Sequence, residues 1–391
     1  MTIANRWLLP DGVEELLPAQ AEQAEALRRQ LLDLYHSWGY ELVIPPLFEF
    51  TDSLLVGLGS DVDLQTFKVV DQLSGRMMGI RADITPQVAR IDAHCLKREG
   101  ATRLCYAGSV IHTRPKKLMA SRSPIQLGAE LYGDAGLASD IEIISLMLET
   151  LRSTGLKNIT LDLGHVGIYR ALLAQAKLSA EDETVLFETL QRKSAGEIAE
   201  LIDRVVADKA LAKLMLAVSQ LNGDRSVLKK ARELLKGADT AIIDAIDALE
   251  QVADSIAARM PEVNLYFDIC ELRGYHYYTG LVFAALAPGY GHAVANGGRY
   301  DDIGKVFGRA RPATGFNTDL KALLQLLPNS VPPNAKAIYA PGDDSLALWH
   351  AIQDLRANGE RVISGLSDQA VVAGCDRQLV LEQGQWVVLP L

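Results

Sequence analysis

The sequence predicts an α+β fold in which strands and helices form a core that carries a helical insertion. Runs of alternating apolar residues are interspersed with amphipathic helices through most of the chain, whereas the interval of about residues 166–260 is almost wholly helical in pattern. Beyond a proline-bracketed stretch at 328–333, the chain reads as strand, helix, strand and hairpin. We therefore expect a core over residues 1–327, a linker over 328–333 and a short α/β domain over 334–391.

Composition indicates an ordinary globular protein. The chain has 391 residues, of which 49% are hydrophobic and 23% charged. No apolar run approaches membrane-spanning length, and the N-terminus lacks a basic-then-apolar export signal, so we expect no membrane partner. The four cysteines form no CxxC pair and no metal-ligand cluster: Cys95, Cys105, Cys270 and Cys375. They predict buried thiols in a reducing cytosol, and hence a cytoplasmic protein without metal or other cofactor.

The charge balance weakens a nucleic-acid function without excluding it. The formal net charge is −10, and the short basic run consists of Arg114, Lys116 and Lys117. Affinity for nucleic acid depends on many contacts between basic groups and phosphates, so we expect no nucleic-acid partner.

The N-terminal third predicts a helix followed by short strands. Pro18 suits a first helical position and Gly39 a C-terminal one. YELVIPPLFEF predicts a strand that breaks at its two prolines, and TFKVVD with RMMGIRAD predicts a hairpin. Apolar side chains recur at helical spacing between the two helix ends: Ala24, Leu27, Leu31, Leu34 and Trp38.

The next segment brings polar residues into apolar surroundings. In RADITPQVAR, Thr85 is predicted to cap a helix that begins at Pro86, although a capping threonine can also line a pocket. ATRLCYAGSVIHT and IQLGAELYG predict paired strands. Gln126 and Glu130 lie an even number of residues apart and so share one face of their strand. Because a buried carboxylate needs a partner, a ligand or a structural salt bridge is implied, and both remain open.

A helix over SDIEIISLMLETLRSTG and strands over NITLDLGH and VNLYFDIC bracket the predicted insertion. GFNTDLKALLQLL is predicted to begin a helix. In the last domain AKAIYA and RVIS predict strands around the helix SLALWHAIQDLRANG, and RQLVLE with QWVVL a hairpin.

The segment Glu271–Ala284, ELRGYHYYTGLVFA, is the richest in polar aromatic residues, and its composition predicts a strand. On a strand, Tyr275 and Tyr277 would face one side, and His276 and Tyr278 the other. This composition also suits a plain core strand.

Arg273 followed by Gly274 distinguishes the segment from an ordinary core strand. A guanidinium beside a residue that permits close backbone approach suits an anionic group of a small ligand.

Taken together, these motifs resemble the histidyl-tRNA synthetase family of class II aminoacyl-tRNA synthetases. RGYHYYTGLVF is similar to that family's histidine-binding signature RGLDYYTGTVF, and GGRYDD and RADIT match further motifs. The resemblance covers roughly residues 5–325 and implies an antiparallel sheet flanked by helices and a homodimer formed through this core. Asp83 stands where the family has a glutamate. Carried over by position, the histidine pocket would comprise Asp83, Thr85, Gln126, Glu130, Arg273, Tyr277 and Tyr278. Arg273 would hold the carboxylate, Glu130 or Asp83 the α-amino group, and Tyr277 or Tyr278 the imidazole edge.

The nucleotide half of the site departs from the family. His112 and Ala322 replace the two arginines that hold ATP phosphates in the family, and Arg114 replaces an acidic residue. Charge-assisted hydrogen bonds contribute about 1.5–3 kcal/mol each. Losing two would slow adenylation on the order of a hundred- to ten-thousand-fold.

A chain that keeps the histidine pocket but has lost the ATP site resembles the regulatory subunits of ATP phosphoribosyltransferase. A C-terminal domain similar to a truncated anticodon-binding domain fits the same reading. The resemblance implies a non-catalytic chain that acts with the short catalytic subunit, in a hetero-octamer, at the first step of L-histidine biosynthesis and carries histidine feedback. An active or divergent histidyl-tRNA synthetase and a tRNA-binding sensor remain as alternatives.

Overall fold

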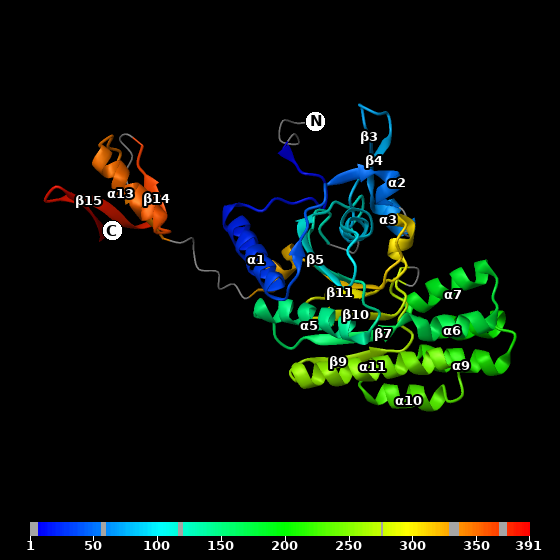
Figure 1. Ribbon diagram of the computed structural model, residues 1–391. Helices are drawn as coiled ribbons and strands as arrows, with labels where there is room; N and C mark the ends of the chain where they lie inside the picture. Colours follow the sequence, from blue (N-terminus) through cyan, green and yellow to red (C-terminus); the bar gives the residue numbers. More distant parts are fainter. Residues whose placement is uncertain (1–6, 56–59, 116–119, 275–276, 328–335, 367–373) are drawn as a thin grey trace. The chain divides into compact units, whose positions relative to one another are not determined.

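The computed structural model describes residues 7–55, 60–115, 120–274, 277–327, 336–366 and 374–391, and its α+β architecture confirms the predicted fold class (Figure 1). The chain divides into two compact units, residues 1–15 with 24–327 and residues 16–23 with 328–391. The predicted linker at 328–333 lies outside the described residues, as do Tyr275 and His276.

A nine-stranded sheet, in the order β1-β5-β6-β12-β11-β10-β7-β9-β8, organises the described part of the larger unit. The sheet is antiparallel except for the pairs β1–β5 and β7–β9, which are parallel. The expectation of an antiparallel sheet is therefore wrong for these two pairs, because long crossovers return each second strand in the direction of the first. The strands are β1 (Glu41–Leu42), β5 (Thr102–Ser109), β6 (Ile125–Tyr132), β12 (Ala313–Asp319), β11 (Ala293–Arg299), β10 (Leu281–Leu286), β7 (Thr160–His165), β9 (Asn264–Asp268) and β8 (Asn222–Gly223).

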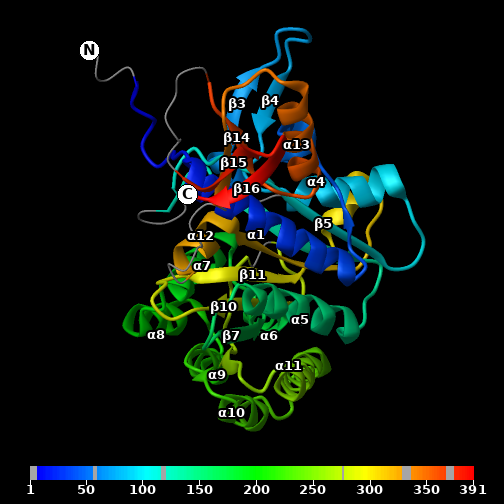
Figure 2. The same ribbon diagram turned by 90° about the vertical axis from the view of Figure 1, so that its left-hand side faces the viewer.

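The long helix α5 (Leu137–Ser153) packs on one face of this sheet, and α1 (Pro18–Ser37) contacts the same face through Tyr35. The rings of Tyr35 on α1 and Phe316 on β12 lie edge to face at 6.0 Å, and the Thr150 hydroxyl of α5 donates a hydrogen bond to the Tyr35 hydroxyl. Figure 2 shows α5 along β10 and β11. Because successive residues of a strand face opposite sides, Gly315 next to Phe316 faces the other side, which is left for the site described below.

A group of helices fills the connection between β7 and β9 and lies beside these strands (Figure 1). Each helix buries apolar residues at helical spacing, for example Ile242, Ile246, Leu249 and Ala253. The helices are α6 (Val166–Ala176), α7 (Ala180–Arg192), α8 (Ala195–Val205), α9 (Lys209–Ser219), α10 (Ser226–Leu234) and α11 (Thr240–Arg259).

A small second sheet confirms the predicted hairpin. β3 (Phe67–Val70) and β4 (Met77–Ile80) pair antiparallel, and β2 (Phe48–Phe50) pairs with the other edge of β4. The break at Pro45 and Pro46 is also confirmed, since it separates β1 from β2. Two short helices, α2 (Thr51–Leu54) and α3 (Ser60–Gln65), connect β2 to β3.

The C-terminal unit has the predicted order of elements. β13 (Ala337–Ala340) is followed by α13 (Leu346–Ala357) and β14 (Val362–Ser364), and the hairpin of β15 (Cys375–Glu382) and β16 (Gln385–Pro390) completes a four-stranded sheet. Ile338, Leu348 and Ile352 belong to its core.

Several local predictions are wrong. The strand expected over 271–284 begins only at Leu281, because the chain turns at Gly274, whose φ is +62°. GFNTD is the end of β12, and the helix α12 (Leu320–Leu326) starts after it because Asp319 caps the helix by accepting a hydrogen bond from the Lys321 N–H. Of the four cysteines predicted to be buried, Cys95 is exposed, since it lies on the outer side of a π-helix (Ile91–Leu96), and Cys375 is only partly buried.

Within the described ranges, no helix combines the length and the apolar run needed to cross a bilayer. The same ranges contain no group of three histidine, cysteine or acidic side chains arranged as metal ligands.

Candidate functional site

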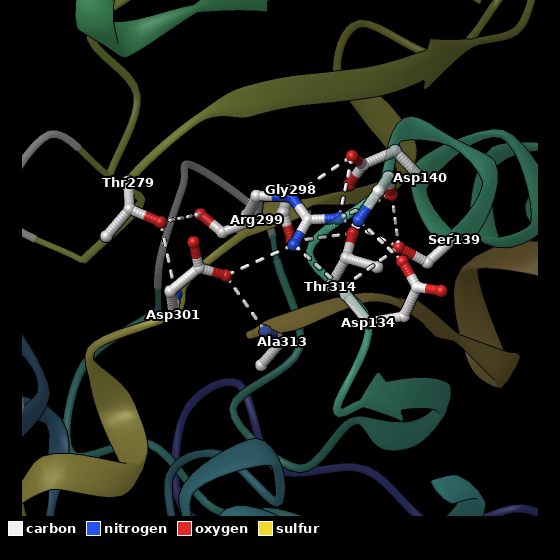
Figure 3. Close-up of polar contacts among 10 residues, drawn as sticks. Asp134, Ser139, Asp140, Thr279, Gly298, Arg299, Asp301, Ala313 and Thr314 are labelled. Atoms are coloured by element: carbon white, nitrogen blue, oxygen red, sulfur yellow. Dashed lines mark hydrogen bonds and ion pairs between the residues drawn. The ribbon is translucent and has the colours of Figure 1, made fainter. Parts of the chain in front are cut away.

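A buried arginine at the end of β11, where the GGRYDD motif lies, forms a network of polar contacts (Figure 3). The Arg299 side chain is 9% exposed, and its Nε and Nη2 donate to one carboxylate oxygen of Asp140 at 3.0 and 2.8 Å. Nη2 also donates to the Ser139 hydroxyl at 2.8 Å, and Nη1 donates to Asp301 at 3.2 Å. This network fixes the backbone on both sides of the next residue, Tyr300.

Glu130 is the carboxylate at the centre of the site, on the sheet face opposite α1 and α5. It is 1% exposed, and the Tyr106 hydroxyl donates to its Oε1 at 3.0 Å while the Tyr300 hydroxyl donates to its Oε2. A Cβ at Gly315, its register partner on β12, would lie 1.6 Å from Oε2, so only glycine leaves room for this carboxylate. Among the described residues, the Tyr106 and Tyr300 hydroxyls donate to Glu130 and no basic group forms an ion pair with it, so the structural salt bridge considered from the sequence is not formed there.

Asp83, Thr85 and Gln126 form the polar wall beside Glu130. Gln126 shares its face of β6 with Glu130, as predicted, and its side chain accepts from the Ile84 N–H at 2.9 Å and donates to Asp83 at 3.1 Å. Thr85 is not an N-cap, because the helix α4 (Thr85–Arg90) already begins at this residue without a side-chain cap. Its hydroxyl lies 3.1 Å from the Tyr106 hydroxyl and so joins the wall to Glu130.

The turn at Gly274 places two tyrosines on the site. The N–H groups of Tyr277 and Tyr278 both donate to the Gly274 carbonyl, at 2.7 and 2.8 Å. The Tyr277 ring stacks on Tyr300 at 5.1 Å and meets Tyr278 edge to face at 5.1 Å. The Tyr277 hydroxyl is buried and has no hydrogen-bond partner among the described residues. A buried tyrosine hydroxyl normally finds a partner, so this oxygen is open to a ligand group.

Arg273 lies apart from these residues. Its side chain is 44% exposed, and its Nη2 pairs with Glu271 at 3.0 Å and with Asp162 at 3.4 Å. The structure thus brings together six of the seven expected histidine-pocket residues and directs the arginine to neighbouring carboxylates.

Burial controls the protonation of Glu130. Removal from water raises the pKa of this carboxyl to about 8, although hydrogen bonds from Tyr300, Thr85 and Tyr106 favour the ionised form, and the Asp83 charge raises the pKa further. The group is therefore mostly protonated at neutral pH in the free protein. A ligand ammonium beside it would favour loss of that proton.

The free energy of unfolding should fall with rising pH because of Glu130. The native pKa is raised above the unfolded value near 4.5, so the stabilisation is fully present below about pH 4.5 and is lost as pH rises to about 8. A single such group adds a slope of up to ~1.4 kcal/mol per pH unit. Urea unfolding of the wild type and Glu130→Gln between pH 5 and pH 8.5 measures the difference. Equal slopes in both proteins would contradict this assignment.

Of the three altered nucleotide positions, two line a cavity and one lies on the surface. His112 and Ala322 line one cavity of about 170 Å³, together with Gln126, Asn317 and Lys321. His112 is buried, with Nε2 2.9 Å from the Ala82 carbonyl oxygen, and Arg114 is exposed. Lys321, the basic residue in this lining, already contacts Glu14 at 3.3 Å. The two positions where the synthetase family has arginines thus line the same cavity, but here they are occupied by His112 and Ala322.

Sequence reasoning missed Tyr106 and Tyr300, the two hydroxyls that hold Glu130. Tyr300 lies within the GGRYDD motif, which marked the segment without indicating a role. Tyr106 gave no signal beyond its place on a predicted strand.

Comparison with known proteins shows the family of the chain. The family profile described as Histidyl-tRNA synthetase matches residues 12–323, and the profile described as ATP phosphoribosyltransferase subunit HisZ C-terminal domain matches residues 335–389. Proteins named ATP phosphoribosyltransferase regulatory subunit from Thioalkalivibrio sulfidiphilus and Stutzerimonas stutzeri are 56% and 55% identical to the chain. Each alignment covers 100% of this chain and 100% of the relative. The chain belongs to the family of ATP phosphoribosyltransferase regulatory subunits.

Solved structures agree with this family. A Bacillus halodurans protein described as an ATP phosphoribosyltransferase regulatory subunit/histidyl-tRNA synthetase is 26% identical, with a TM-score of 0.81 over 93% of this chain and 94% of that one. A histidyl-tRNA synthetase from Nostoc sp. has a TM-score of 0.78 at 16% identity over 98% and 97% of the two chains, which shows the shared fold. The resemblance inferred from the motifs is thereby confirmed, and the relatives are named as regulatory subunits.

Proposed function

We propose that this chain activates a short catalytic subunit of ATP phosphoribosyltransferase in the cytoplasm and that L-histidine, bound in the pocket around Glu130, inhibits the complex. Binding of histidine is supported by the buried Glu130 carboxyl beside the Tyr277 hydroxyl, which has no hydrogen-bond partner in the part of the chain that the structure describes. The absence of arginine at 112 and 322 supports regulation rather than adenylation.

The pocket offers complementary groups for each end of an amino acid with an imidazole. Glu130 and Asp83 supply carboxylate oxygens for the α-ammonium group. The Tyr277 hydroxyl is suited to hydrogen-bond an imidazole nitrogen, and the Tyr278 ring beside it supplies apolar contact. Arg273 is the cation nearest in sequence to these tyrosines and is assigned the ligand carboxylate.

The chain is proposed to form homodimers through its synthetase-like core. These homodimers would combine with catalytic subunits into a hetero-octamer. Support comes from apolar side chains exposed around the edge strand β1, where Ile44 is 82% exposed and Phe48 54% exposed. Exposed apolar side chains concentrated on one segment are typical of an interaction surface.

Phosphoribosyl-ATP formation by a short catalytic subunit tests the function directly. Addition of this chain is expected to raise the rate on the order of tenfold or more, and L-histidine is expected to reverse the activation. The reason is that histidine can act only by binding one state of the complex more tightly than another. Light scattering of the same mixtures reports the stoichiometry.

The result would be negative if a competent catalytic subunit responded neither to the chain nor to histidine. Histidine-dependent ATP–pyrophosphate exchange by the chain alone would instead indicate a working synthetase. Activation without histidine inhibition would keep the regulatory role and reject histidine as its ligand.

A further inference from the structure

A cluster of five charged side chains lies where the loop after β9 crosses β7. Asp162 on β7, Asp268 at the end of β9 and Glu271 in the loop supply three carboxylates, whose side chains are 14%, 3% and 10% exposed. Arg273 pairs with Asp162 and Glu271, and Lys193 pairs with Asp268. The cluster therefore contains three carboxylates and two basic side chains.

The backbone holds this cluster independently of the Arg273 guanidinium. The Glu271 N–H donates to the Asp268 carbonyl at 3.2 Å, and the Arg273 N–H donates to Glu271 Oε1 at 2.6 Å. By contrast, the guanidinium makes both of its ion pairs with described residues through Nη2 alone. Its side chain is 44% exposed, so it can leave these carboxylates without breaking the loop.

Arg273 is also close in the chain to Tyr278, one of the residues of the proposed pocket. Burial raises the pKa of the Tyr278 hydroxyl, Asp83 and Glu130 on the pocket side raise it further, and the Arg273 charge lowers it. The residue after Arg273, Gly274, accepts a hydrogen bond from the Tyr278 N–H at 2.8 Å, so the arginine lies next to the turn that carries this tyrosine. A carboxylate that entered beside Tyr278 would compete with Asp162 and Glu271 for the same guanidinium.

We propose that Arg273 exchanges partners when histidine binds. Asp162 and Glu271 hold the guanidinium in the free protein, the ligand carboxylate takes it over in the complex, and Asp162 then accepts one proton from the solvent. Asp162 and Glu271 are positioning residues for Arg273. The inference rests on the proposed binding of histidine in this pocket.

The charge balance of the cluster explains why Asp162 would take up a proton when histidine binds. Burial raises the pKa of Asp162 to about 6, Glu271 and Asp268 raise it too, and Arg273 and Lys193 lower it. When Arg273 leaves, Lys193 is the cation that remains in the cluster, and Lys193 pairs with Asp268. The pKa of Asp162 must then rise further toward neutrality, and the carboxyl takes up a proton near pH 7.

Calorimetric titration of the full-length chain at pH 7, in two buffers with different ionisation enthalpies, counts the protons that accompany binding. With L-histidine, the wild type is expected to take up about half to one proton more than Asp162→Asn. Glu130 titrates in both proteins, so its contribution cancels in this difference. L-Histidinol, which lacks the carboxylate, is expected to show no such difference.

Affinity separates this role from a merely structural one. Asp162→Asn removes a competitor for Arg273, so histidine should bind about two- to fivefold more tightly, in keeping with a partly exposed ion pair. Glu271→Gln should act in the same direction and provides a second variant if Asp162→Asn unfolds. Asp203→Asn, which removes an exposed carboxylate of α8, is the matched control and should behave as the wild type.

Each outcome has a distinct meaning. Histidine binding with equal proton counts in wild type and Asp162→Asn would overturn the exchange and leave the proposed function standing. Weaker binding by both Asp162→Asn and Glu271→Gln would assign them a structural role instead. A wild-type chain that binds no histidine, alone or with the catalytic subunit, would overturn both proposals.

Discussion

Replacing Arg299 with methionine is expected to lower the free energy of unfolding of the larger unit by about 3–5 kcal/mol. The substitution removes the partner of Asp140, whose side chain is 3% exposed, and leaves this carboxylate buried without its cation. It also removes donors to the Ser139 hydroxyl and to the Asp134 and Gly136 carbonyls. Chemical unfolding of the full chain, followed by circular dichroism, measures the loss.

An exposed arginine provides the matched control. Arg192 pairs with Glu197 on the surface, where the two side chains are 59% and 58% exposed, so Arg192→Met should change the stability by less than ~1 kcal/mol. The double variant Arg299→Met/Asp140→Leu should recover part of the loss, because it leaves no unpaired buried charge at this pair. A similar small effect for Arg299→Met and Arg192→Met would show that the buried network does not stabilise the fold.

Glu130→Gln is expected to weaken histidine binding by roughly 10- to 100-fold, and to shift histidine inhibition of phosphoribosyl-ATP formation to correspondingly higher concentration. The physical reason is the loss of an ionisable carboxylate that would form a charge-assisted hydrogen bond to the ligand ammonium. Glutamine keeps the size of the side chain and can still accept from the Tyr106 or Tyr300 hydroxyl. Activation of the catalytic subunit should therefore survive.

Glu197→Gln, which also removes one carboxylate but on an exposed helix, should leave histidine inhibition unchanged. Titration calorimetry and the activity assay together check the prediction. Unchanged inhibition by histidine in Glu130→Gln would place the histidine site elsewhere in the complex.

The polar face of β6 could be anticipated because strand periodicity is a local property. Gln126 and Glu130 are four residues apart, and any extended strand places them on one side. The start of α1 at Pro18 was equally local, since proline fits the first turn of a helix, where its missing N–H costs no hydrogen bond. The motif resemblance added Asp83, Thr85, Tyr277 and Tyr278 by position alone.

The same local reasoning failed at the segment that begins with Glu271. Tyrosine and valine favour strands, so the whole run was predicted to be extended. The turn at Gly274 instead sets Tyr277 and Tyr278 against each other, which two neighbouring positions on one strand would not allow. The strand propensity of this segment is thus overridden by the turn at Gly274, which is accompanied by stacking of Tyr277 on Tyr300.

From the sequence alone came the α+β class, most helices and strands, the family, and the six expected pocket residues that the fold brings together. Tertiary structure decided which groups hold the Glu130 carboxylate, since Tyr106 and Tyr300 are 24 and 170 residues away along the chain. It also decided that Arg273 pairs with Asp162, 111 residues distant. Periodicity and turn chemistry act between near neighbours, whereas burial, pKa and ion pairing depend on residues that only the folded sheet brings into contact.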